Sequence, residues 1–216
     1  MNKKIVIIGG GGHASVLAEI LSRSGMKVFA VVSPEPPEKT ILFNGAEYWH
    51  SDDIIYTLSP DKYILVNGIG SMPGNTLRTR IAENARQNGL QFMTIVSPDA
   101  YVSPASKLAE GVQVMPRAVI QPGCTIDRDV IVNTGSIVEH DCQIGASVHL
   151  APGSVLSGGV RIGSEVHIGT NATVIQGITI GQNSIIGAGV VVNKMVDACS
   201  ILYPARPHIR SLNDVK

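Results

Sequence analysis

The chain has 216 residues, of which 44% are hydrophobic, and a formal net charge of zero at pH 7. This length suits one or two domains, the hydrophobic content excludes a disordered chain, and the balanced charge excludes a broad basic surface for nucleic acid. No apolar run reaches the roughly 18 residues of a membrane-spanning helix, and the run after the amino terminus is too short for a signal-peptide core. We therefore expect a cytoplasmic globular protein that binds neither membrane nor nucleic acid.

The first part of the chain, residues 1–96, is predicted to form a Rossmann-like α/β domain. A buried strand at 4–8 is followed by glycines, a helix over 14–23 and a second strand at 27–32. This βαβ order implies a parallel sheet. The same alternation predicts helices near 52–58 and 75–88 and strands at 63–67 and 91–95.

The glycine-rich loop after the first strand is the first candidate site. Gly9-x-Gly11-x-x-Ala14 matches a fingerprint that binds phosphate on backbone N–H groups at a helix start. A nicotinamide dinucleotide site has an acidic residue at the end of the second strand, where this chain has Val32 and Ser33. We interpret the loop as a site for the pyrophosphate of a nucleotide-sugar, with a ligand-free tight turn as the alternative. His13 is placed to donate to a phosphate or a sugar hydroxyl, or is a solvated loop histidine.

Beyond residue 96 the sequence repeats every six residues. Every sixth residue from Val102 to Val192 is aliphatic, and the residues four places later are small or aliphatic. A hexapeptide repeat predicts a parallel β-helix in which three repeats form one triangular coil of about 18 residues. We expect about five such coils over residues 97–196, wound left-handed, and an extended tail over 197–216.

Several features of the repeat carry further expectations. Cys124 and Cys142 lie one coil apart and are interpreted as reduced core thiols. No cysteine or histidine spacing suggests a metal site, so no metal is expected.

A thin prism has flat sides that bury more surface when copies pack together, which favours a homotrimer. Corners that need an unusual φ are predicted at the glycines that follow inward aliphatic residues, Gly145, Gly163, Gly169, Gly181 and Gly187.

The segment Glu139-His140-Asp141 is the second candidate site. A neighbouring carboxylate raises the basicity of a histidine and fixes its tautomer, as a general base requires. Neighbours in an extended strand point to opposite sides, so at most one of Glu139 and Asp141 helps directly. A charged surface coil without a catalytic role is the alternative.

The remaining histidines of the repeat constrain where such a site can lie. His149 and His167 are one coil apart and stack on one side of the predicted prism, whereas His140 lies half a coil from His149. Within one chain His140 and His149 then lie on opposite sides, so a site that uses both must lie between two subunits. A surface histidine ladder is the alternative, and His208 in the tail is expected to be exposed to solvent.

These motifs together resemble a known family: the sugar acetyltransferases with a left-handed β-helix, of the sialic acid O-acetyltransferase and bacillosamine or perosamine N-acetyltransferase type. The resemblance covers nearly the whole chain. It rests on the glycine loop, the entry into the repeat, the histidine segments and the last coils, at residues 7–13, 97–100, 133–141, 149–153, 187–189 and 204–206.

The resemblance implies transfer of the acetyl group of acetyl-CoA, without a metal, to the amine of a nucleotide-linked 4-amino-4,6-dideoxy sugar for surface polysaccharide or glycan synthesis. The alternative is O-acetylation of sialic acid or a related sugar hydroxyl; a non-catalytic nucleotide-sugar sensor and a nucleotidyltransferase are further classes. Bacillosamine-type members carry paired aspartates after the second strand, where this chain has Ser33 and Pro34. The nucleotide therefore stays open between GDP, dTDP and UDP.

The resemblance also implies roles for individual residues. His140 looks like the general base and Asp141 its acidic partner, and Asn133 lies near the reacting centre. His149 looks like the residue that contacts the thioester of acetyl-CoA, supplied by the neighbouring subunit. The remaining contacts are backbone contacts to acetyl-CoA at Thr170 and Ala188, and contacts to the nucleotide-sugar at Gly11, Gly12 and His13.

Overall fold

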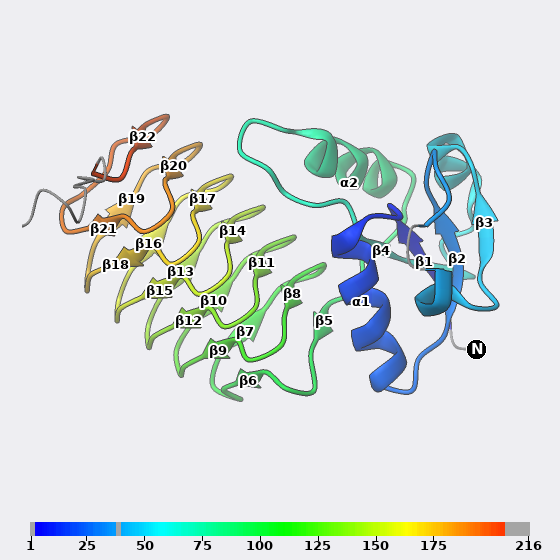
Figure 1. The fold of residues 1–216 in the computed structure, drawn as a ribbon, viewed down its shortest axis with the longest axis horizontal. Helices are drawn as coiled ribbons and strands as arrows, with labels where there is room; N and C mark the ends of the chain where they lie inside the picture. Colours follow the sequence, from blue (N-terminus) through cyan, green and yellow to red (C-terminus); the bar gives the residue numbers. More distant parts are fainter. Residues whose placement is uncertain (1–2, 38–39, 206–216) are drawn as a thin grey trace, which may run out of the picture.

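A computed structural model describes residues 3–37 and 40–205 of the chain. It has two parts: an α/β domain and a long stack of short strands that extends away from it (Figure 1). Within these residues no helix combines the length and apolar character needed to cross a lipid bilayer.

The α/β domain contains a parallel sheet with the strand order β3-β2-β1-β4. Side chains alternate along these strands, so Ile5 and Ile7 pack under α1 while Val6 and Ile8 pack toward α2. The elements are β1 (Lys4–Ile8), α1 (Gly12–Arg23), β2 (Val28–Val32), η1 (Thr40–Phe43), β3 (Glu47–Trp49), η2 (Asp52–Thr57), β4 (Tyr63–Asn67) and α2 (Leu77–Gln87).

Three details of this domain differ from the sequence prediction. The segment expected as a helix near 52–58 is the 3₁₀-helix η2, and the short strand β3 was not predicted. The predicted strand at 91–95 is wrong. Only Phe92 forms an isolated bridge to Leu65, because the chain then leaves this sheet and β5 (Ile95–Val96) pairs with β8 in the next part of the fold.

The second part is a left-handed β-helix with three parallel sheets, as the hexapeptide repeat predicts. Each strand pairs with the strand one coil away, as Ile131 does with His149. The seven-stranded sheet contains β5, β8 (Gln113–Val114), β11 (Ile131–Val132), β14 (His149–Leu150), β17 (His167–Ile168), β20 (Ile185–Ile186) and β22 (Ile201–Leu202). The six-stranded sheet contains β6 (Tyr101–Val102), β9 (Val119–Ile120), β12 (Ile137–Val138), β15 (Val155–Leu156), β18 (Thr173–Val174) and β21 (Val191–Val192). The five-stranded sheet contains β7 (Lys107–Leu108), β10 (Thr125–Ile126), β13 (Gln143–Ile144), β16 (Arg161–Ile162) and β19 (Thr179–Ile180).

The inside of the prism is filled by the two registers that the repeat predicts. The aliphatic register supplies buried residues such as Leu150 and Ile168, and the small register supplies Cys124, Cys142 and others. Both cysteines are free, and their thiols donate to backbone carbonyls, Cys124 Sγ to Glu139 O at 3.1 Å and Cys142 Sγ to Ser157 O at 3.3 Å. These bonds satisfy carbonyl groups that would otherwise face an apolar core.

Every corner from Gly111 to Gly189 contains one residue in the left-handed backbone region, three residues after the inward aliphatic residue. Asp141 is one of these, with φ 61°, after Val138. The expectation for Gly145 and the four similar glycines is wrong, because their φ is not positive. Their lack of a side chain serves close packing instead: a Cβ on Gly145 would lie 2.7 Å from Ser164 N in the next coil.

The α/β domain packs against the outer face of the seven-stranded sheet. Leu17 of α1 belongs to the same core cluster as Met115 and Ile131 of the β-helix. Beside this contact, Arg86 of α2 donates to both oxygens of Asp129, at 2.6 and 2.8 Å, and through Nε to Glu110 Oε1 at 3.0 Å. The side chain of Asp129 is only 7% exposed, so this ion pair fixes α2 to the first coils.

Replacing Arg86 with Ala should leave the Asp129 carboxylate buried without a partner, which we expect to lower the free energy of unfolding by about 2 kcal/mol. The urea midpoint of the variant measures this loss. Arg80→Ala, at an exposed position of the same helix, is the matched control and should change stability by less than about 0.5 kcal/mol. Equal midpoints for the two variants would contradict the assigned role of the Arg86 pair.

Candidate functional site

The glycine loop forms a cavity of about 360 Å³ at the carboxyl ends of β1, β2 and β4. A Cβ on Gly11 or Gly12 would meet nothing within 4 Å, so the loop backbone is open to a ligand. Gly11 is the N-cap of α1 and offers no side chain to the first N–H groups of the helix. Amide groups at a helix start, in an open cavity, suit a phosphate.

His13 lies where this cavity meets the β-helix. Gln113 Nε2 donates to Asn67 O at 2.8 Å, which turns Gln113 Oε1 toward His13 Nε2, also at 2.8 Å. His13 therefore donates through Nε2 to Gln113. The ring N–H that the sequence predicted to bind a ligand instead forms a hydrogen bond between the two domains. Burial, with a smaller effect of the Arg78 charge, lowers the pKa of His13 to about 4. The ring is neutral at pH 7.

Arg78 of α2 fixes the second loop of this cavity, at residues 67–70. Its Nη1 donates to Asn67 O at 2.8 Å and to Ile69 O at 2.7 Å. These bonds fix the turn at Gly68, where a Cβ would lie 2.7 Å from the Cβ of Ala14. Burial lowers the pKa of Arg78 to about 10, which leaves the guanidinium charged at pH 7. The close contact between the two loops depends on glycine at 68.

His140 lies at the corner between β12 and β13 and forms a pair with Asp141. His140 Nδ1 is 2.9 Å from Asp141 Oδ2, and the side chain of His140 is 64% exposed. This hydrogen bond is the largest cause that raises the pKa of His140; burial opposes it, and the charges of Asp141 and Glu139 add to it. The Nδ1 proton faces Asp141, so Nε2 carries the lone pair that can accept a proton. Of the two neighbouring carboxylates, Asp141 bonds the ring.

His149 differs from His140 in its burial and in the direction of its pKa shift. Asn133 Oδ1 accepts from Thr134 N at 2.8 Å, which turns Asn133 Nδ2 toward His149 Nε2 at 3.0 Å. His149 Nε2 is therefore the acceptor and Nδ1 carries the proton. His149 is buried and its ring lies 4.9 Å from that of His167 in an edge-to-face arrangement. Burial, and then the charge of His167, lowers the pKa of His149 to about 3.

Thr170 and Ala188 are exposed and lie one coil apart at the corner that follows the seven-stranded sheet. Gly189 N donates to Thr170 O at 2.8 Å. A Cβ on Gly169 would lie 2.5 Å from Ala188 N, so these two coils pack closely here. Asn133 follows β11 of the same sheet and therefore stands at the same edge of the prism.

The structure brings the predicted site residues together in three groups. Asn133, His149, Thr170 and Ala188 share the edge beside the seven-stranded sheet, and Gly11, Gly12 and His13 lie in the α/β domain that covers this sheet. His140 and Asp141 stand apart, at the corner between the six-stranded and five-stranded sheets. His208 lies outside the described residues.

Two residues at these sites were not identified from the sequence. Asp52 lines the glycine-loop cavity together with Val32 and Pro34, and burial raises the pKa of its carboxyl group. Its only sequence signal is its place after Ser51 at the start of a short helix. Gly158 lies against the His140 ring, a contact between successive coils that the repeat alone does not reveal.

Comparisons with known proteins match both parts of the chain. Residues 4–85 match the PglD N-terminal domain, and residues 159–194 match the hexapeptide repeat of succinyl-transferase. The chain is 34% identical over 119 residues to the UDP-N-acetylbacillosamine N-acetyltransferase of Bacillus subtilis, a match that spans 52% of this chain and 51% of that relative. The chain thus spans about half the length of this curated relative.

Two solved structures match almost the whole chain. The acetyltransferase domain of PglB from Neisseria gonorrhoeae, in complex with acetyl coenzyme A, is 33% identical with a TM-score of 0.83, over 96% of this chain and 100% of that one. PerB from Caulobacter crescentus, in complex with CoA and GDP-perosamine, is 37% identical with a TM-score of 0.82, over 95% of this chain and 97% of that one.

A Rossmann-like domain docked on a hexapeptide β-helix defines a class of two-domain acyltransferases. Within that class, the chain belongs to the left-handed β-helix sugar acetyltransferases of the bacillosamine and perosamine N-acetyltransferase type. The family and the fold predicted from the sequence are confirmed.

The lowered pKa values of His13 and His149 predict how the stability of the fold depends on pH. His13 and His149 have folded-state pKa values of about 4 and about 3, below the ordinary 6.5. Between pH 4 and 6.5 the unfolded chain therefore binds more protons than the folded chain, and the free energy of unfolding falls as pH drops, by up to about 1.4 kcal/mol per pH unit for each group. Urea midpoints from pH 7.5 to 5 measure this slope.

The variant His149→Gln should make this loss on acidification smaller, because glutamine does not titrate. His140→Gln is the control: the raised pKa of His140 stabilises the fold at low pH, so its removal should not reduce the loss. The same slope in His149→Gln and in the unmodified protein would show that His149 protonates freely in the folded state.

Proposed function

We propose that this protein transfers the acetyl group of acetyl-CoA to the amine of a nucleotide-linked 4-amino-4,6-dideoxy sugar, a step in surface polysaccharide or glycan synthesis in the cytoplasm. The observation that carries the proposal is the His140–Asp141 pair, in which Asp141 bonds Nδ1 of an exposed ring at a corner of the β-helix and leaves Nε2 as the basic nitrogen. The relatives solved with acetyl-CoA, or with CoA and GDP-perosamine, support the same choice of substrates.

We assign the two substrates to the two domains. Residues 1–96 bind the nucleotide-sugar at Gly11, Gly12 and His13, in the cavity of the glycine loop. Residues 97–196 bind acetyl-CoA along the edge with Thr170 and Ala188. Within the segment 197–216, expected as an extended tail, β22 (Ile201–Leu202) pairs with β20 and continues the seven-stranded sheet.

The chemistry follows from the state of the two histidines. As the sugar amine attacks the thioester carbonyl, His140 Nε2 takes a proton from the nitrogen, and Asp141 stabilises the imidazolium that forms. Neutral His149, beside Asn133, contacts the thioester and adds no charge that would draw the proton back. The C–S bond breaks, and the CoA thiolate leaves and takes up a proton. No step requires a metal.

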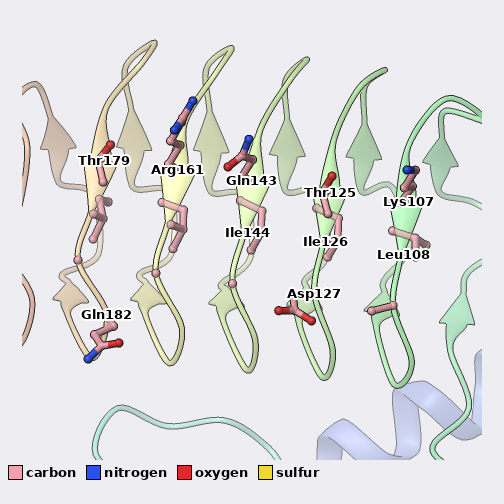
Figure 2. A pocket seen from close by; sticks show the side chains of 16 residues that line it. Lys107, Leu108, Thr125, Ile126, Asp127, Gln143, Ile144, Arg161, Thr179 and Gln182 are labelled. Carbon is pink, nitrogen blue, oxygen red and sulfur yellow. The ribbon is translucent and has the colours of Figure 1, made fainter.

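We propose further that the enzyme is a homotrimer with its active sites between subunits. His140 stands at the corner after β12, whereas His149 lies on β14 of a different sheet, so one chain does not offer both to the same substrate. The side that begins at the His140 corner has an open groove of about 950 Å³ along the five-stranded sheet. Its lining residues include one from each strand, and these stand in a row (Figure 2): Lys107, Thr125, Gln143, Arg161 and Thr179. A second copy packed on this side would bury it.

The first test is release of thiol from acetyl-CoA with GDP-, dTDP- and UDP-linked 4-amino sugars and with free sialic acid. We expect turnover with one nucleotide-linked amino sugar, and a decrease of kcat by about 100-fold or more in a folded His140→Ala variant, the usual effect of a lost general base. Turnover only with sialic acid would establish O-acetylation instead. Near-normal turnover of the His140→Ala variant would exclude His140 as the base.

A mixture of two inactive variants tests the shared site. Subunits with His140→Ala and subunits with His149→Ala, refolded together in equal amounts, should regain about a quarter of full activity, because each interface needs one intact histidine from each neighbour. The control mixes His140→Ala subunits with subunits that carry both His140→Ala and His149→Ala. No subunit in this mixture has the base, so it should give no activity. If the mixture of the two single variants also gave no activity, the whole site would lie within one chain.

A further inference from the structure

The imidazole of His140 lies directly over Gly158, the residue one coil later at the same corner. A Cβ placed on Gly158 would lie 2.6 Å from His140 Nε2 and 2.7 Å from Cε1. Cβ atoms essentially never approach other heavy atoms closer than 3.0 Å. The observed position of the ring is therefore compatible only with glycine at 158.

The backbone of Gly158 does not itself require glycine. The left-handed residue of this corner is the next one, Gly159, with φ 68°, whereas the φ of Gly158 is not positive. The neighbouring backbone is held by its own hydrogen bond, from Gly159 N to His140 O at 2.8 Å. The absence of a side chain at 158 thus leaves the space that the ring of His140 occupies.

In the preceding coil Gly123 lies beside Asp141, and this glycine is also the left-handed residue of its corner, with φ 79°. A Cβ on Gly123 would collide with Asp141 Oδ1, so this carboxylate lies against bare backbone. The His140–Asp141 pair is therefore fitted between two glycines, Gly123 on one side and Gly158 on the other. Each partner is kept where the Nδ1···Oδ2 hydrogen bond of 2.9 Å can form.

We propose that Gly158 is a positioning residue for the general base: its missing side chain opens the slot in which the His140 ring stays bonded to Asp141 with Nε2 toward the substrate. This inference rests on the proposed function. The side chain of His140 is 64% exposed, so a methyl group at 158 can push the ring into solvent without disturbing the core. The cost should fall on catalysis and not on stability.

The test is Gly158→Ala. We expect a decrease of kcat by about 10- to 100-fold, little change in KM for either substrate, and an unchanged melting temperature. Because the displaced ring loses the bond that raises its pKa, the acidic limb of the kcat/KM profile should move to lower pH. A general loss of structure would not produce this shift.

Two further variants separate positioning from folding. In the His140→Ala background, Gly158→Ala should cause no further decrease, because there is no ring left to displace. Gly145→Ala is the contrasting variant: its Cβ would lie 2.7 Å from the backbone atom Ser164 N, which cannot swing away, so the melting temperature should fall.

Near-normal kcat in Gly158→Ala, while His140→Ala is inactive, would overturn this inference and leave the proposed function standing. A further decrease in the double variant would also overturn it. Full activity of His140→Ala would instead contradict the proposed function itself.

Discussion

The constraint on which this structure depends is the hydrogen bonding of each coil of the β-helix to the next. Strands of two residues pair with strands one coil away, so the chain must turn after every hexapeptide with the same geometry. From Gly111 to Gly189, one residue in the left-handed region makes each turn, and it is a glycine or a residue such as Asp141 or Asn171. A displaced corner would break the pairing of the coils on both sides of it.

This regular scaffold gives the two candidate catalytic histidines different environments. His140 stands on a corner, where it is exposed and its pKa is raised by a hydrogen bond to Asp141. His149 stands in a strand that the α/β domain covers, where burial lowers its pKa to about 3. One position suits a residue that accepts a proton and the other suits a histidine that stays neutral, so environment divides the roles between two identical side chains.

The α/β domain is part of this arrangement and not an independent module. The chain of hydrogen bonds from His13 through Gln113 to Asn67 ties the glycine loop to the seven-stranded sheet. The Arg86–Asp129 pair fixes α2 to the first coils. The cavity of the glycine loop therefore keeps a fixed position relative to the edge with Asn133 and His149, as the proposed transfer between two bound substrates requires.

The sequence by itself determined the β-helix, the glycine loop and the presence of a histidine–carboxylate pair, because each is written in a short local pattern: an aliphatic residue at every sixth position, a fingerprint between strand and helix, and adjacent residues. It also predicted that His140 and His149 lie on different sides. Only the tertiary structure decided that His13 bonds Gln113, that Asp52 lines the cavity, that glycines such as Gly145 serve close packing, and that Gly158 makes room for the His140 ring. These are contacts between segments far apart in the chain, and their distances depend on how the coils and domains pack.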